Sequence, residues 1–292
     1  MELRVLKYFL TTAREENITK AAQSLHISQP TLSRQLMQLE EELGVTLFHR
    51  SSHNIILTDE GQLLKRRAQE MLSLVDRAKN EISQRNTELA GVVTIGSGEL
   101  RSVGTLSRAM SAFHAEHQQV QFSIYSGNVD NVKERIDMGL IDVGLFAEPA
   151  DVSKYEFIRM PETEINGVIV RRDSDLASMK AATPKDLAEV PLLLPGRALL
   201  HNEYANWFGE YFDRLKIIAN FNLLYNAAVM VRNGIGAAFC ARLDFDYEDL
   251  VFLPLSPKME FGSVLAWKRE SIFPPATKTF LEFAKSYIKG IS

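Results

Sequence analysis

The stretch AQSLHISQPTLSRQLMQLE, residues 22–40, contains two leucine-bearing helical segments joined by a few polar residues. The second segment begins SQP at residues 28–30. Proline suits the first turn of a helix, because its missing N–H has no intrahelical partner there. The helical pattern continues to about Leu43, and Gly44 is a natural residue to end it. We therefore expect a short helix, a tight turn and a longer second helix.

The longer helix has two different faces. One face is apolar, with leucines at spacings of 4, 3 and 4 residues: Leu32, Leu36, Leu39 and Leu43. The open face is polar and carries Gln29, Thr31, Ser33, Arg34 and Gln38. These side chains make a poor catalytic set, but they suit contacts with base edges and phosphates.

Helix signals dominate the sequence on both sides of this pair. A first apolar stripe at helical spacing consists of Leu3, Leu6, Phe9, Leu10 and Ala13. Asn17 fits the N-cap of the short helix, at about residues 18–25. Residues 45–58, VTLFHRSSHNIILT, read as two short strands around a polar tip at residues 50–54, which predicts a hairpin, or wing.

A long helix follows the wing, capped by Thr58-Asp59-Glu60 and running to about Asn86. Its apolar residues follow a spacing of 4-3-4-3-4: Leu64, Ala68, Met71, Val75, Ala78 and Ile82. This heptad seam is typical of a helix that pairs with a second copy. The alternative is a helix packed on its own domain. The length and the narrow stripe favour the dimer helix.

After TELAG, residues 87–91, the pattern changes to alternating strands and helices, with strands at about 92–96, 120–127 and 141–146. Such alternation predicts a parallel sheet covered by helices. A second set of the same kind follows, which predicts two lobes with a cleft between them. The expected boundaries are residues 1–58 for the winged helix-turn-helix, 59–87 for the linker helix and 88–292 for the two-lobed domain. Within the latter, lobe I covers about 91–161 and 266–292, and lobe II about 162–265.

The bulk properties give only weak guidance. The 292 residues have a net charge of −4, with +1 over residues 1–87 and −5 over the remainder, so bulk charge does not favour nucleic acid binding. There is no apolar run of membrane-span length and no secretory signal, which predicts a cytoplasmic protein. Cys240 is the only cysteine, which excludes an intrachain disulfide and a multi-cysteine zinc site. It stands in an apolar run and reads as a small buried hydrophobe.

Residues 9–64 closely resemble the N-terminal domain of LysR-type transcriptional regulators. The likeness rests on AAQSL, SQPTLSRQLMQLEEELGVTLFHR and LTDEG, each at the family's spacing. The resemblance extends over essentially the whole chain. It implies an α/β multidomain protein with an N-terminal winged helix-turn-helix, a long dimerising linker helix and a C-terminal two-lobed, periplasmic-binding-protein-like α/β domain. It also implies a homodimer or homotetramer, a small-molecule effector, contact with RNA polymerase and no cofactor.

In a helix-turn-helix, the N-terminal residues of the second helix face base edges in the major groove of double-stranded DNA. The residues expected there are Ser28, Gln29, Pro30, Thr31, Ser33 and Arg34. Gln38 is as well explained by a surface position as by a DNA contact. At the wing tip, Arg50, Ser51 and His53 are expected along the DNA backbone, where contacts position the protein without reading sequence.

Ligands of two-lobed α/β domains bind outside the C-terminal ends of the strands. The candidates at such ends are Ser97, Gly98, Ser126, Asn128, Phe146, Arg197 and Asn226. Arg197 could hold a carboxylate. Glu99 argues against an anionic ligand, because an acid at this strand end repels an anion or attracts an amine. Ser126 and Asn128 are also explained by a turn and an N-cap.

Two other classes of protein are alternatives to a DNA-binding regulator. An enzyme or solute-binding protein is disfavoured, because the sequence has no GxSxG, GxxxxGK[ST] or HExxH motif and no metal-ligand cluster of histidines. A winged helix used for protein contacts is disfavoured, because its open face lacks aromatic anchors. We therefore expect a non-enzymatic regulator that binds an inverted-repeat site and responds to a metabolite in the cleft.

Overall fold

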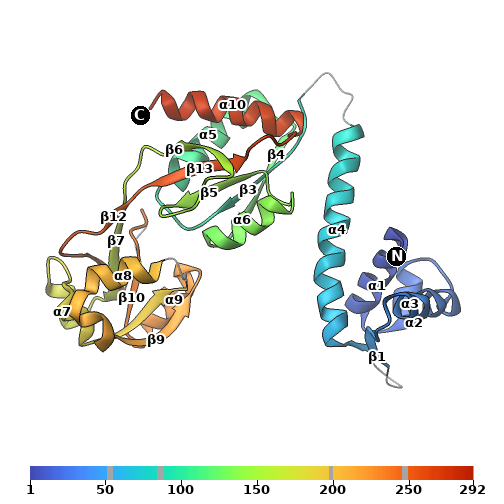
Figure 1. Ribbon diagram of the computed structural model, residues 1–292, viewed down its shortest axis with the longest axis horizontal. Helices are drawn as coiled ribbons and strands as arrows, with labels where there is room; N and C mark the ends of the chain where they lie inside the picture. Colours follow the sequence, from blue (N-terminus) through green and yellow to red (C-terminus); the bar gives the residue numbers. More distant parts are fainter. Residues whose placement is uncertain (51–54, 84–88, 197–199, 245–248, 292) are drawn as a thin grey trace. The chain divides into compact units, whose positions relative to one another are not determined.

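The computed structural model describes residues 1–50, 55–83, 89–196, 200–244 and 249–291 (Figure 1). The chain divides into two compact units, Met1–Arg85 and Asn86–Ser292. Among the described residues, no helix is long and apolar enough to cross a membrane.

The first unit is a helical domain with a small hairpin. Its elements are α1 (Leu3–Glu15), α2 (Ile18–Ser24), α3 (Gln29–Leu43), β1 (Phe48–Arg50), β2 (Ile55–Leu57) and α4 (Asp59–Ser83). The Asn17 side chain caps α2 by accepting a hydrogen bond from the Lys20 N–H at 3.0 Å. Ser28 caps α3 in the same way, and Gly44 ends that helix with a φ of 68°. These helix boundaries follow from the capping residues that the sequence contains.

The core of the first unit joins the three N-terminal helices to the wing and to the start of α4. Phe9 and Phe48 pack with ring centroids 5.2 Å apart. Ala68 is fully buried in this same core, and Leu64 and Met71 pack against it. The first half of the expected dimer seam is therefore occupied by the domain's own residues, and Ala68 is corrected from a dimer contact to a core residue. Val75 is half-buried and Ala78 exposed, whereas the side chain of Ile82 lies outside the described part.

The second unit contains two α/β lobes. The sheet of the first lobe has the order β4-β3-β5-β13-β6. Its elements are β3 (Gly91–Ser97), α5 (Val103–Glu116), β4 (Val120–Ser126), α6 (Val129–Asp137), β5 (Val143–Ala147), β6 (Tyr155–Arg159), β13 (Ser263–Lys268) and α10 (Pro275–Lys289). Strands β3, β4 and β5 are parallel, and β13 runs antiparallel to its two neighbours.

The sheet of the second lobe has the order β11-β7-β10-β8-β9, and β12 pairs with β7. Its elements are β7 (Glu164–Arg171), η1 (Asp175–Ser178), α7 (Pro184–Ala188), β8 (Pro191–Pro195), α8 (Leu200–Phe208), η2 (Gly209–Arg214), β9 (Lys216–Phe221), α9 (Leu224–Arg232), β10 (Ala237–Ala241), β11 (Leu250–Pro254) and β12 (Glu260–Phe261). The chain passes between the lobes before β7 and again before β13 (Figure 1). The second passage precedes Ser263, slightly earlier than the boundary expected at residue 266.

Each lobe has helices on both faces of its sheet. In the first lobe, α5 and α10 cover one face and α6 the other (Figure 1). Phe113 of α5 lies at the centre of the larger core, with its ring centroid 5.3 Å from that of Phe280 in α10. In the second lobe, α7 and α8 cover one face and α9 the other. Because both faces are covered, the strand ends are the parts of each sheet that can reach a ligand.

Candidate functional site

The N-terminal end of α3 presents an exposed polar surface. Ser28, the N-cap, lies 2.8 Å from Thr31 between hydroxyl oxygens, so the two side chains hold each other in place. Arg34 is exposed and forms no ion pair within the described residues. The other exposed residues expected at DNA are Gln29, Pro30 and Gln38, and Ser33 is half-buried. The helix dipole makes this end suitable for a phosphate, although Pro30 has no N–H and the Thr31 N–H is bonded to Ser28.

The opposite end of α3 is fixed to the wing by Glu40. Its carboxylate accepts hydrogen bonds from the backbone N–H groups of Leu47 at 2.7 Å and Phe48 at 3.2 Å. The hairpin pairs Phe48 with Leu57 and Arg50 with Ile55. Glu40 thus sets the angle between α3 and the wing. No local sequence pattern reveals these partners of Glu40, which lie seven and eight residues further along the chain.

The wing tip is only partly described. Arg50 ends strand β1, but nothing is described of its side chain. Ser51 and His53 lie outside the described residues. The base of the hairpin is well defined, because the Thr58 hydroxyl donates to the Thr46 carbonyl oxygen at 2.7 Å and accepts from the Gly61 N–H at 2.9 Å.

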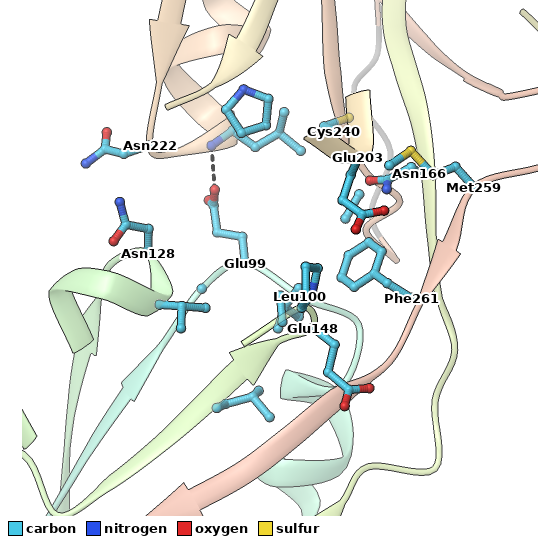
Figure 2. Close-up of a pocket in the computed structure, with 18 of the residues that line it drawn as sticks. Glu99, Leu100, Asn128, Glu148, Asn166, Glu203, Asn222, Cys240, Met259 and Phe261 are labelled. Atoms are coloured by element: carbon cyan, nitrogen blue, oxygen red, sulfur yellow. Dashed lines mark hydrogen bonds between the residues drawn. The ribbon is translucent and has the colours of Figure 1, made fainter. Parts of the chain in front are cut away.

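The second unit has a cavity of about 190 Å³ between its two lobes (Figure 2). The first lobe lines it at the ends of β3, β4 and β5, and the second lobe at the ends of β8, β9 and β10. This is where the carboxyl ends of parallel strands meet, which is the usual ligand position in such folds. The lining residues that carry polar side chains include Glu99, Asn128, Asn166, Glu203 and Asn222.

Two of the expected effector residues line this cavity. Gly98 follows β3, and Asn128 lies between the end of β4 and the start of α6. The Asn128 side chain also accepts a hydrogen bond from the Asn131 N–H at 2.9 Å, so it both caps α6 and faces the cavity. Arg197 lies outside the described residues.

Four of the expected residues do not line the cavity. Phe146 is fully buried on the other face of β5, where its ring meets that of Tyr155 at 5.6 Å. Its neighbours Leu145 and Ala147 line the cavity instead. Ser97 is buried, and its hydroxyl donates to the Gly98 carbonyl oxygen at 2.7 Å. The remaining two, Ser126 and Asn226, are exposed to solvent outside the cavity.

Glu99 makes a hydrogen bond across the cleft. It follows β3 in the first lobe, and its carboxylate accepts from the backbone N–H of Leu224, the first residue of α9 in the second lobe (Figure 2). A carboxylate at this position satisfies a free N–H group and complements the helix dipole. The sequence singled out Glu99 as an acid near a strand end, but not this partner.

A second connection between the lobes is buried. Glu164 begins β7 and is fully buried, and its carboxylate accepts from the N–H groups of Arg101 and Ser102, both at 3.0 Å. The Ser102 hydroxyl also donates to Glu164 at 2.8 Å, and the Ser263 hydroxyl donates to that of Ser102 at 2.9 Å. Glu164 and Ser263 stand at the two chain passages between the lobes, so this network joins both passages to the start of α5.

Cys240 lines the cavity but is only 4% exposed. Burial raises the pKa of its thiol to about 12. The thiol is therefore protonated at neutral pH, as expected of a small buried hydrophobe. Among the described residues there is no group of three or more His, Cys, Asp or Glu side chains that could hold a metal ion.

A helix-turn-helix unit joined to a two-lobed α/β unit with an interlobe cavity defines a ligand-responsive DNA-binding protein. Residues 3–62 match the family model "Bacterial regulatory helix-turn-helix protein, lysR family". Residues 86–289 match that of the "LysR substrate binding domain". The chain belongs to the LysR family of transcriptional regulators. It is thus a DNA-binding regulator with an effector-binding domain, which confirms the expected family, fold class and non-enzymatic function.

Individual relatives cover the full length of the chain. The HTH-type transcriptional regulator YybE of Bacillus subtilis is 30% identical over 297 residues, which cover 98% of this chain and 99% of the relative. The Hca operon transcriptional activator HcaR of Escherichia coli is 25% identical over 304 residues, covering 100% of both chains. The crystal structure of CbnR, a LysR family transcriptional regulator, has the same fold, with a TM-score of 0.75 at 22% identity over 99% of each chain.

Proposed function

We propose that this regulator binds an inverted-repeat site in double-stranded DNA through the N-terminal end of α3, as a homodimer or homotetramer. The observation that carries the proposal is the surface of α3, where Gln29, Thr31 and Arg34 are exposed at the N-terminal end of the helix. Gln can pair with adenine and Arg with guanine or phosphate. A related solved structure, of full-length CbnR, is a complex with its target DNA, and it covers 98% of this chain with a TM-score of 0.73.

The second part of the proposal concerns control. A small molecule bound in the interlobe cavity would favour one arrangement of the lobes, and this would change DNA binding or contact with RNA polymerase at the promoter. A coupling of about 1–3 kcal/mol between the two sites is typical of such systems. Because its partners are DNA and RNA polymerase, the proposed place of action is the cytoplasm.

The proposal is tested by fluorescence anisotropy at fixed salt. The probe is the DNA upstream of the gene that encodes this chain, and a scrambled duplex is the control. We expect a preference of about 10³ or more for the upstream DNA. Equal and steeply salt-dependent binding to both duplexes would contradict sequence-specific recognition, because phosphate contacts alone give that result.

Arg34→Ala tests the docking of α3. We expect a loss of DNA affinity of about tenfold or more, because one good base or charged contact contributes on that scale. Arg14→Ala is the matched control, since Arg14 is an exposed arginine of the same unit that pairs with Glu15 at 2.9 Å on α1. Equal affinity and equal site preference of the Arg34→Ala variant and the original protein would show that α3 docks differently.

A further inference from the structure

The polar part of the interlobe cavity is predominantly acidic. Its lining includes four glutamates, which are Glu99, Glu148, Glu203 and Glu260. Among the described residues that line it, there is no lysine, arginine or histidine. The charge that a ligand meets in this cavity is therefore set by how many of these carboxylates are already neutralised.

Two of the four carboxylates have a cationic partner. Glu148 accepts two hydrogen bonds from Nη1 of Arg159, at 2.9 and 3.0 Å. Its side chain extends away from the other labelled carboxylates (Figure 2). Glu260 lies 3.9 Å from Nζ of Lys258, a weaker contact between exposed groups.

Glu99 and Glu203 have no ion-pair partner among the described residues. Glu99 holds the N-terminus of α9 through the Leu224 N–H. A helix N-terminus that faces a cleft is a natural site for an anionic ligand. Here the protein's own carboxylate fills that site, so an anionic effector would lose this donor and meet a negative charge.

Glu203 lies in different surroundings, at the other end of the cavity. Figure 2 shows it beside Phe261, with Asn166 and Met259 on the same side. A carboxylate, an amide oxygen and the face of an aromatic ring are the groups that hold an ammonium ion in proteins. They come from α8, β7 and β12 of the second lobe, where β12 pairs with β7.

The remainder of the lining is largely apolar. It includes Leu100, Leu145, Tyr204, Phe221 and Leu224. Such a surface takes up the apolar body of a ligand, while a few polar groups fix its orientation. A volume of about 190 Å³ suits a compact metabolite rather than a drug-sized molecule.

We propose that the effector of this regulator is a cation: a compact molecule with an apolar body and a protonated amino group, held at Glu203 against Phe261 and Asn166. Glu99 adds a second negative charge to the cavity while it joins the two lobes. This inference rests on the proposed function, in that it takes the interlobe cavity as the effector site. It names the chemical class that the cavity accepts.

The test compares ligands that differ only in their head group. Isothermal titration of the full-length protein uses two series, namely 2-phenylethylamine, 3-phenylpropanoate and 2-phenylethanol, and then hexylamine, heptanoate and 1-hexanol. We expect the amine of at least one series to bind about tenfold or more tightly than its alcohol, as a charge-assisted hydrogen bond provides. The carboxylates should bind more weakly than the alcohols.

Variants then locate the cation. Glu203→Gln should weaken amine binding by about tenfold or more and leave alcohol binding unchanged. Glu99→Gln keeps an acceptor for the Leu224 N–H and should weaken amine binding less. The matched control is Glu210→Gln, since Glu210 is an exposed glutamate of the second lobe outside the cavity lining. It should bind every probe as the original protein does.

Three results would overturn the cationic class. The first is a carboxylate that binds more tightly than its matched amine, above all if Arg197→Gln abolishes that binding. The second is amine binding that Glu203→Gln does not change. The third is the absence of amine binding in both series at millimolar concentration. The anisotropy titration on upstream DNA is independent of all three, so a failed ligand class is distinguished from a failed DNA-binding function.

Discussion

Cys240 shows how the surroundings of one side chain set its chemistry. It lines the cavity, yet it is 4% exposed and burial raises its pKa to about 12. We expect iodoacetamide to modify Cys240 at pH 8 at least about 10²-fold more slowly in the folded protein than in the urea-unfolded chain, because the thiolate is the nucleophile. Mass spectrometry of timed samples measures both rates. Equal rates would show that the thiol reaches solvent through the cavity.

The same pKa shift has a consequence for stability. The unfolded chain forms the thiolate near its ordinary pKa of about 8.5, whereas the folded chain holds the proton up to about pH 12. Cys240 therefore leaves stability unchanged below about pH 8.5 and lowers it as the pH rises from there toward 12. Cys240→Ala should remove this part of the alkaline loss, which urea unfolding at pH 8 and pH 10 measures.

Some single residues could be predicted from the sequence and others could not. Asn17 was identified as the N-cap of α2, because an N-cap is a local feature of the chain. Ser28 was expected only near the start of α3, and the structure shows it as the N-cap. Phe146 was misplaced toward the cavity, because β5 is buried on both faces and its sequence lacks the alternation that tells them apart. Only the packing of α6 against one face shows that Leu145 faces the cavity.

At the scale of elements, the start of α4 depends on a close approach to the wing. A Cβ at Gly61 would lie 2.2 Å from the carbonyl oxygen of Leu47 and 2.9 Å from Cδ2 of Leu57. At Gly44 a Cβ would meet nothing within 4 Å, and the only cost is its φ of +68°. The two glycines therefore have different roles. Gly44 provides the left-handed conformation that ends α3, whereas Gly61, in the first turn of α4, allows the close approach to the wing.

Gly61→Ala and Gly44→Ala test this difference. We expect Gly44→Ala to lower the free energy of unfolding by about 1 kcal/mol, the cost of a left-handed conformation. Gly61→Ala should lower it by about 2–3 kcal/mol, since the helix must move away from backbone atoms. Urea unfolding followed by circular dichroism gives both values. If the two variants lose equal stability, the close approach at Gly61 contributes nothing.

The long helix shows what a heptad pattern leaves open. The apolar spacing at Leu64, Ala68 and Met71 was interpreted as a dimer seam, but these residues pack against the core of their own domain. The alternative interpretation, a helix packed on its own domain, thus applies to the first half of α4. A sequence pattern records that a face is apolar and does not record which surface covers it.

At the scale of the whole molecule, the cleft could be predicted, but most of the side chains that line it could not. Strand ends and a two-lobed topology follow from the alternation of elements, and the cavity lies there. Glu203 and Phe261 are 58 residues apart in the sequence, and only the fold makes both of them line the cavity. Glu99 was singled out as an acid that opposes an anionic ligand, and its bond to Leu224 supports that interpretation.

The buried Glu164 network joins the two lobes, and this gives it a measurable effect on the whole unit. Glu164→Ala would leave two backbone N–H groups and the Ser102 hydroxyl without an acceptor. We expect the free energy of unfolding to fall by about 3–5 kcal/mol, the scale for an unsatisfied buried polar group or charge network. Thermal unfolding by calorimetry checks this. Glu134→Ala, an exposed glutamate on α6, is the control and should change little.

We expect the proposed assembly to use the second half of α4, because its first half is already packed against the core of the first unit. Val75 is half-buried and Ala78 exposed within the first unit, so both are available to a second copy. We expect Val75→Glu to dissociate the linker dimer, because two like charges would face each other in an apolar seam.

Ser73→Glu is the matched control, since Ser73 is exposed about half a helical turn away from Val75, on the opposite face. Sedimentation velocity measures the mass of each variant. A dimer or tetramer of unchanged mass in Val75→Glu would show that subunits pair through another surface, whereas loss of assembly in both variants would indicate a general effect of added charge.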